Sequence, residues 1–222
     1  MDRFEAVLFD CDGVLVDSEP ITNGVLRMML NEAGWDLSQA ECERHFIGRA
    51  VRDQQALIEQ HTGQPLTDAW MRAFYARRDE RLRAELRAMD GALQAVMAAH
   101  RHTAGRIACA SGADRAKVVM QIEMAGMRPF FGDRIFSGHD LPRSKPHPDV
   151  YLAAADHVGV APSRCLVIED TATGVEAGLA AGATVWGYCP AGHGRAFDGL
   201  AVARVFHHMD ELTQALAADG AG

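Results

Sequence analysis

The sequence predicts an α/β protein, a doubly wound parallel sheet with an all-helical segment inserted after the first strand. Two observations support this fold class. Short apolar runs alternate with helical patterns over the second half of the chain, as expected for a parallel sheet covered on both faces. By contrast, about 70 residues after the first apolar run show helical spacing and little strand signal. The 222 residues, 48% hydrophobic and 23% charged, are enough for one globular domain plus an insertion.

The first strand is predicted at residues 4–10, and it ends at a carboxylate. Val7-Leu8-Phe9 is an apolar run typical of a strand buried on both faces. Asp10 and Asp12 follow at the carboxyl end of the strand, where open α/β sheets bind ligands, and the period of two directs both to one side. Two close carboxylates need a cation between them or a retained proton. Mg²⁺, which uses one or two carboxylates plus water and phosphate, meets that need.

The dipeptide Asp12-Gly13 between two apolar runs is also a hairpin-turn signal, and such a turn is compatible with a catalytic acid. An EF-hand calcium loop that starts at Asp10 is excluded. Its last position requires a bidentate glutamate, and Ile21 stands there.

Residues 20–88 are predicted to form roughly four helices, because apolar residues such as Val25, Met28 and Met29 recur at helical spacing. Breaks are expected at Gly34, at Gly48 and in the turn at 62–65. A helical insertion beside a strand that carries catalytic groups is most simply a cap over the site. We therefore predict a core of residues 1–16 and 89–222 and a cap of residues 17–88. The arginine-rich end of the cap is expected to be a solvated helix face, from which Arg77 or Arg78 could reach an anionic substrate.

The second half of the chain is predicted to alternate regularly between helices and strands. The helices are expected at 91–102, at 114–125, after the loop of residues 140–148 as far as residue 157, and at 173–181. The strands are expected at 106–110, 134–136, 165–168 and 184–186. The strand at 184–186 is expected to complete the core.

Polar residues follow three of these strands directly. Asp10 and Asp12 follow the first, Ser111 ends the second, and Glu169-Asp170 follows the strand at 165–168. Since parallel strands end at one edge of the sheet, these groups describe a site for a metal and an anion. Taken singly, Ser111-Gly112 could be a simple helix N-cap, and Thr171 a helix-start residue.

Lysine is scarce in this chain, since Lys117 and Lys145 are the only two among 22 basic residues. A compact ammonium suits a single-point contact with a phosphate or a carboxylate. Pro146 restricts Lys145 to an extended backbone and so fixes its direction. We therefore predict that Lys145 is a site residue rather than a surface lysine.

Together these segments resemble the four ordered motifs of the haloacid-dehalogenase-like phosphatases. The matching residues are Asp10-Cys11-Asp12-Gly13, Ser111, Lys145-Pro146 and Glu169-Asp170, and the resemblance covers nearly the whole chain, helical cap included. It implies a Rossmann-like core whose first strand is central, between the strands that carry Ser111 and Glu169-Asp170.

The resemblance also implies roles for these residues. Asp10 is the expected nucleophile and Asp12 the general acid and base, while Ser111 and Lys145 hold phosphoryl oxygens. Mg²⁺ is expected at Asp10, at the carbonyl of Asp12 and at Asp170, with Glu169 binding directly or through water. The reaction implied passes through an aspartyl phosphate on Asp10.

Within that family, Asp12 argues against a dehalogenase, whose leaving group needs no proton, and the absence of lysine from residues 17–88 excludes a phosphonoacetaldehyde hydrolase. β-Phosphoglucomutase shares the core motifs but carries a histidine at the position of Thr22 and an arginine at that of Val51. The segment 136–140 is similar to bacterial sugar-phosphate phosphatases, such as those for 6-phosphogluconate. We predict an Mg²⁺-dependent phosphatase for a small phosphorylated metabolite, with a mutase or a non-catalytic metabolite-binding relative as alternatives.

The substrate is expected to contact residues of both the core and the cap. The predicted substrate-binding residues are Gly13, Glu19, Arg49, Arg52, Ser111, Gly112 and Lys145. A net charge of −8 argues against nucleic acid and anionic membranes as partners. Five cysteines without CxxC pairing, and no long apolar run, indicate a cytoplasmic protein with reduced thiols. The sequence leaves the oligomeric state open.

Overall fold

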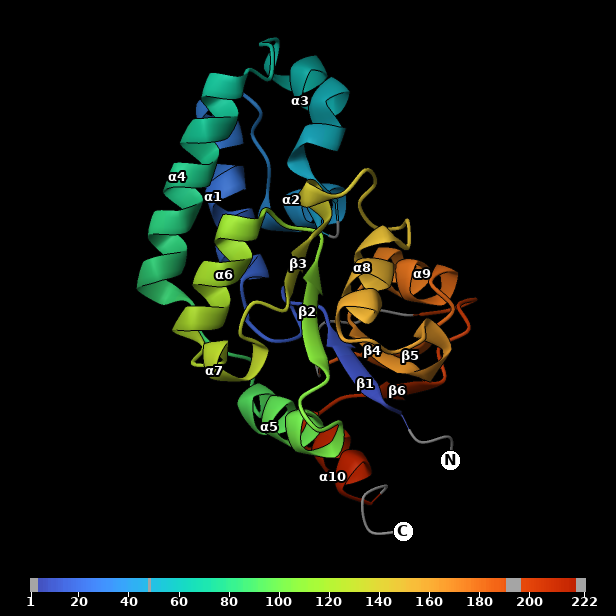
Figure 1. The fold of residues 1–222 in the computed structure, drawn as a ribbon. Helices are drawn as coiled ribbons and strands as arrows, with labels where there is room; N and C mark the ends of the chain where they lie inside the picture. Colours follow the sequence, from blue (N-terminus) through green and yellow to red (C-terminus); the bar gives the residue numbers. More distant parts are fainter. Residues whose placement is uncertain (1–3, 48, 191–196, 219–222) are drawn as a thin grey trace. The chain divides into compact units, whose positions relative to one another are not determined.

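The computed structural model of the chain describes residues 4–47, 49–190 and 197–218. It divides into two compact units, one of residues 1–16 and 88–222 and one of residues 17–87. Figure 1 shows the fold and labels its elements. None of the helices in the described ranges has the length and apolar character needed to cross a membrane.

The larger unit contains a six-stranded parallel sheet with the strand order β3-β2-β1-β4-β5-β6. Its strands are β1 (Ala6–Phe9), β2 (Ile107–Ser111), β3 (Ile135–Ser137), β4 (Cys165–Glu169), β5 (Thr184–Tyr188) and β6 (Arg204–Phe206). The first strand is central, between β2 and β4, which confirms the predicted doubly wound, Rossmann-like core. All four residues of β1 are buried, as expected for a strand covered on both faces.

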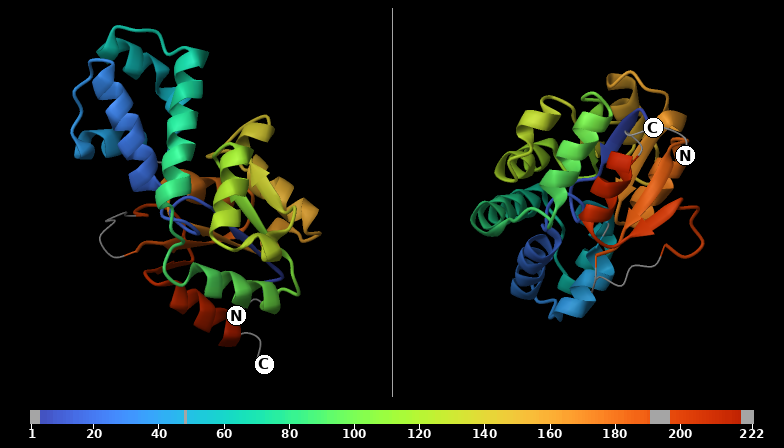
Figure 2. Two further views of the ribbon diagram at one scale, coloured as in Figure 1. Left: turned by 90° about the vertical axis from the view of Figure 1, so that its left-hand side faces the viewer. Right: turned by 90° about the horizontal axis from the view of Figure 1, so that it is seen from below.

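Helices cover both faces of this sheet (Figures 1 and 2). They are α5 (Ala92–His102), α6 (Arg115–Met124), α7 (Arg128–Phe131), α8 (Asp149–His157), α9 (Ala172–Ala180) and α10 (Met209–Ala218), with 3₁₀ turns η2 (Gly138–Asp140) and η3 (Pro162–Arg164). The strand period of two separates the two faces. Leu8 shares a core cluster with residues of α8 and α9, whereas the ring of Phe9 contacts that of Phe131 in α7 on the other face.

The smaller unit is entirely helical among its described residues, as predicted. It contains α1 (Glu19–Glu32), α2 (Gln39–Phe46), η1 (Val51–Gln54), α3 (Gln55–Thr62) and α4 (Asp68–Glu85). The apolar residues at helical spacing in α1, including Val25 and Met29, are buried in this unit's own core. Ser38 and Glu41 form a capping box that fixes the start of α2.

The structure differs from the predicted elements in three places. The sheet does not end at 184–186, because β6 pairs with β5. A further helix, α10, follows β6 and packs against α5. The strand β6 is only three residues long and has one buried side chain, Phe206, so its sequence carries little periodic signal. The short helix α7 was also missed. In addition, Asp12-Gly13 lies in a turn closed by a bridge between Asp12 and Val16 rather than in a two-stranded hairpin.

Candidate active site

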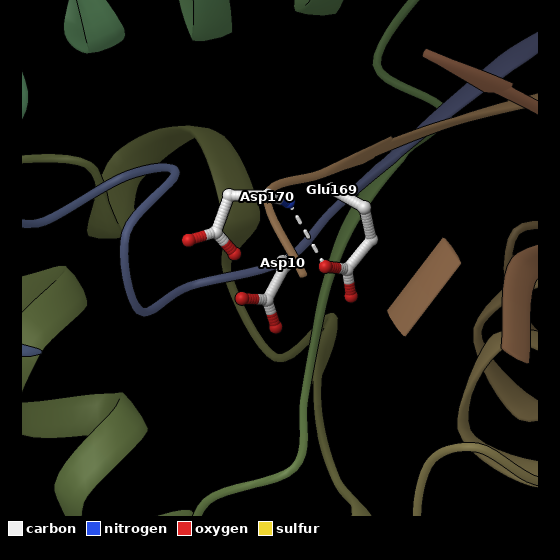
Figure 3. A group of neighbouring side chains, drawn as sticks. All are labelled: Asp10, Glu169 and Asp170. Atoms are coloured by element: carbon white, nitrogen blue, oxygen red, sulfur yellow. Dashed lines mark hydrogen bonds between the residues drawn. The ribbon is translucent and has the colours of Figure 1, made fainter. Parts of the chain in front are cut away.

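Three buried carboxylates meet at the carboxyl ends of β1 and β4. Asp10 follows β1, Glu169 is the last residue of β4, and Asp170 comes next. Parallel pairing of Phe9 with Ile168 places these strand ends side by side. One oxygen of each carboxylate lies within 4.8 Å of the others, and Figure 3 shows the three side chains converging. The sheet therefore brings together residues that are 160 positions apart in the chain.

Lys145 joins this carboxylate cluster. Its Nζ donates hydrogen bonds to Oδ1 of Asp10 and to Oε1 of Glu169, both at 2.6 Å, and its side chain is only 8% exposed. The ammonium also lies 4.9 Å from the centre of the Tyr151 ring. Burial by itself lowers the pKa of Lys145, but Asp10 and Glu169 together raise it well above its usual range. Lys145 is thus a fixed positive charge beside Asp10.

Both oxygens of Glu169 are occupied by donors from the protein. Oε1 accepts from Lys145 and, at 2.7 Å, from the Tyr151 hydroxyl. Oε2 accepts from the backbone N–H groups of Asp170 and Thr171 and from the hydroxyl of Thr171. Because a carboxylate offers about four lone-pair sites, little capacity remains for a direct bond to a cation. The geometry favours Glu169 as the anchor of Lys145.

Two glycines leave room for these carboxylates. A Cβ atom on Gly13 would lie 2.2 Å from Oδ2 of Asp170, and one on Gly174 would lie 1.8 Å from Oε1 of Glu169. Gly13 also has a φ of +79°, which side chains other than hydrogen rarely tolerate. The carboxylates therefore pack directly against backbone.

Asp10 is held in an environment that disfavours its charged form. Burial, followed by the repulsion of Glu169 and Asp12, raises its pKa from 3.8 to about 7, although Lys145 acts in the opposite direction. A divalent cation would reverse this balance. The donors that Asp10 and Asp170 offer are carboxylate oxygens, which hard cations such as Mg²⁺ prefer, so these residues fit a magnesium ion.

The Asp12 side chain is bound by residues of α6. Its Oδ1 accepts from Nζ of Lys117 at 2.7 Å and from Nε2 of Gln121 at 2.9 Å. Sequence reasoning gave neither residue a role, and it also missed Tyr151. The scarcity of lysine was a signal that could have drawn attention to Lys117; Gln121 and Tyr151 carried no such signal.

Ser111 ends β2 beside β1 and is 1% exposed. Its hydroxyl oxygen accepts from the N–H of Ala113 at 3.0 Å, and Gly112 follows it in the same turn. Ser111 is not the N-cap of α6, because Asp114 takes that position. Thr171, in contrast, is the N-cap of α9, in agreement with the simpler interpretation.

The predicted cap residues lie in the helical unit. Glu19 is the first residue of α1, and Arg49 is exposed. Arg52 pairs with Asp68 at 2.7 Å, and both side chains are at least half exposed. Nearer the end of α4, Arg77 pairs with Glu32, while Arg78 is buried and pairs with Asp79. Of the arginines nominated for substrate binding, three are thus engaged by carboxylates of the same unit.

Comparison with known proteins gives the chain a family. Residues 4–182 match the family model described as haloacid dehalogenase-like hydrolase. The 6-phosphogluconate phosphatase of Escherichia coli K12 is 30% identical over 221 residues, which covers 99% of this chain and 98% of that protein.

Two solved structures show the same fold. A HAD family hydrolase from Deinococcus radiodurans R1, with bound phosphate and sodium, is 35% identical, covers 99% of this chain and 98% of its own, and has a TM-score of 0.77. A putative β-phosphoglucomutase from Thermotoga maritima also has a TM-score of 0.77, with coverage of 96% and 99%, but at 21% identity it shows the fold alone. The chain therefore belongs to the haloacid dehalogenase-like hydrolases and is an enzyme of their phosphatase type.

Proposed function

We propose that this enzyme is an Mg²⁺-dependent phosphatase that hydrolyses a small phosphorylated metabolite, most simply a sugar phosphate. The observation that carries the proposal is the buried cluster of Asp10, Asp170 and Lys145, in which a carboxylate nucleophile lies beside a fixed ammonium. Phosphoryl transfer depends mainly on positioning and on neutralising charge, and this cluster can provide both.

In the proposed reaction, a carboxylate oxygen of Asp10 attacks the phosphorus atom, and the bond to the leaving oxygen breaks. Asp12 gives a proton to the departing alkoxide and then takes one from the water that hydrolyses the aspartyl phosphate. Lys145 and Ser111 hold phosphoryl oxygens, and the backbone at Gly13 and Gly112 lies at the same edge of the sheet.

The metal is proposed to be held by Asp10, by the carbonyl of Asp12 and by Asp170. When bound, Mg²⁺ would neutralise charge on the transferring phosphoryl group. Glu169 is proposed to contribute through water and through Lys145, because its own oxygens already accept from five protein donors.

The helical unit is proposed to be a cap, residues 17–88, that supplies specificity through Glu19, Arg49 and Arg52. A cytoplasmic location is proposed as well. Its support is that Cys11, Cys42, Cys109 and Cys165 are buried thiols without disulfide bonds.

The test is phosphate release from 6-phosphogluconate, glucose 6-phosphate, glucose 1-phosphate and p-nitrophenyl phosphate, with Mg²⁺ and with a chelator. We expect turnover that requires Mg²⁺ and is abolished in Asp10→Asn, while Asp156→Asn, an exposed carboxylate of α8, leaves it unchanged. Metal-dependent release that persists in Asp10→Asn would refute the mechanism.

The same assay separates the alternatives. A mutase would interconvert glucose 1-phosphate and glucose 6-phosphate with little free phosphate. A non-catalytic relative would bind a phosphorylated metabolite without turning it over. Hydrolysis is favoured because the cap carries Thr22 and Val51 where the mutases have a histidine and an arginine.

A further inference from the structure

The side chain of Asp12 is held by two donors from one face of α6, and the proposed reaction does not by itself explain them. Lys117 and Gln121 are four residues apart on this helix, so their side chains lie on the same face. Both donate to the same atom, Oδ1 of Asp12. Lys117 is 6% exposed and Gln121 is fully buried.

Both donors are themselves fixed in place. Asp114 is the N-cap of α6, and its side chain accepts from the backbone N–H of Lys117 at 3.0 Å. This bond fixes the backbone of the first turn, from which the Lys117 side chain extends. The carbonyl oxygen of Gln121 accepts from the thiol of Cys11 at 3.5 Å, so its amide nitrogen is directed at Asp12. Asp12 therefore meets preorganised partners.

A buried ion pair is weak evidence for a role in stability, because desolvation opposes the attraction between its charges. If a buried lysine served fold stability alone, an apolar residue of similar length could take its place without loss of stability. Here the ammonium of Lys117 instead binds the carboxyl group of Asp12, which transfers a proton in the proposed reaction. Proton transfer depends on holding that group within hydrogen-bond reach of the leaving oxygen.

We propose that Lys117 and Gln121 are positioning residues that anchor Oδ1 of Asp12 and thereby present the second carboxyl oxygen, Oδ2, to the leaving group. The inference rests on the proposed phosphatase function. Neither residue touches the substrate in this proposal. In the step concerned, the oxygen–phosphorus bond of the substrate breaks, and the proton on Oδ2 passes to the leaving alkoxide.

The test compares kcat/KM for two substrates, glycerol 2-phosphate and p-nitrophenyl phosphate. The first releases an alkoxide that needs a proton, whereas the second releases a stable phenolate that does not. For Lys117→Met we expect a loss of about 100-fold with glycerol 2-phosphate and about threefold or less with p-nitrophenyl phosphate. Gln121→Met should show the same selectivity with a smaller loss, about tenfold.

Three controls make the result specific. Glu123→Gln removes a charge from the exposed surface of the same helix and should change neither value. Circular dichroism and thermal unfolding identify a variant that simply fails to fold. Asp12→Asn should show the same substrate selectivity, and adding Lys117→Met to it should cause no further loss, because Lys117 acts through Asp12.

The outcomes separate the two proposals. If the wild type turns over both substrates and Lys117→Met lowers both equally or neither, the positioning role is overturned while the phosphatase function stands. A further loss when Lys117→Met is added to Asp12→Asn also overturns it. If the wild type with Mg²⁺ hydrolyses neither these substrates nor the sugar phosphates, the proposed function fails, and the positioning role fails with it.

Discussion

Replacing Asp10 with asparagine should make the metal-free protein more stable relative to the wild type at pH 8 than at pH 5, although it removes the proposed nucleophile. Burial and neighbouring carboxylates raise the pKa of Asp10 from 3.8 to about 7. Between these two values, the unfolded chain has lost the Asp10 proton while the folded protein keeps it. The folded state binds more protons, so the contribution of Asp10 to the free energy of unfolding falls as the pH rises through this range.

The size of the effect follows from the same two values. Between pH 5 and pH 8, the unfolded chain is already ionised at Asp10, and the folded protein loses its proton near pH 7. About two pH units at about 1.4 kcal/mol each correspond to about 2–3 kcal/mol. Asparagine does not titrate, and Lys145 keeps Glu169 as its partner in the variant. The stability of Asp10→Asn relative to the wild type should therefore increase by that amount between pH 5 and pH 8.

The assay is urea unfolding with a chelator present, followed by circular dichroism at both pH values. Groups that titrate in this range without interacting with Asp10 cancel when the variant is compared with the wild type. Asp156→Asn, at an exposed position, provides a control that should show no such change. A stability difference between Asp10→Asn and the wild type that is the same at pH 5 and pH 8, or smaller at pH 8, would refute the reasoning. Adding Mg²⁺ should stabilise the wild type more than the variant.

Three further substitutions test the cluster. Gly13→Ala places a methyl group 2.2 Å from Oδ2 of Asp170, so we expect about tenfold weaker Mg²⁺ binding by calorimetry; Gly126→Ala, at a similar φ but in open space, should bind normally. Tyr151→Phe removes a 2.7 Å hydrogen bond to the buried glutamate of β4 and should cost about 1.5–3 kcal/mol in urea unfolding, so an unchanged midpoint would contradict that role. Lys145→Met leaves the buried carboxylates of Asp10 and Glu169 without their ammonium partner. We expect it to abolish turnover and to lower the free energy of unfolding at pH 8 by about 3–5 kcal/mol. An unchanged free energy of unfolding would show that these ion pairs are not needed for folding.

Local patterns were sufficient to predict most of the backbone. The apolar run before Asp10 is typical of a strand buried on both faces, and the alternation after residue 89 is typical of a parallel sheet; the structure confirms both. A polar residue at the end of such a strand must lie at the edge shared by all parallel strand ends. For that reason Asp10 and Glu169 could be assigned to one site from the sequence, whereas Lys145 was assigned to it from the scarcity of lysine and the neighbouring Pro146. The structure brings Lys145 within hydrogen-bond distance of both carboxylates.

The same reasoning failed where the local signal was short. Strand β6 has three residues and one buried side chain, so neither periodicity nor length distinguished it from a loop. It forms because β5 offers an unpaired edge, which is a property of the sheet and not of residues 204–206.

The sequence by itself determined which residues end the strands and therefore which chemistry gathers at the edge of the sheet. Only the tertiary structure decided how those groups are paired. Lys117 reaches Asp12 across 105 positions because α6 presents one face to the end of β1, and the sequence of α6 has only a weak apolar stripe from which that orientation could be predicted. Likewise, Glu169 is recognised as the anchor of Lys145 only once all of its donors are assembled around it, since side-chain hydrogen bonds between distant segments depend on packing.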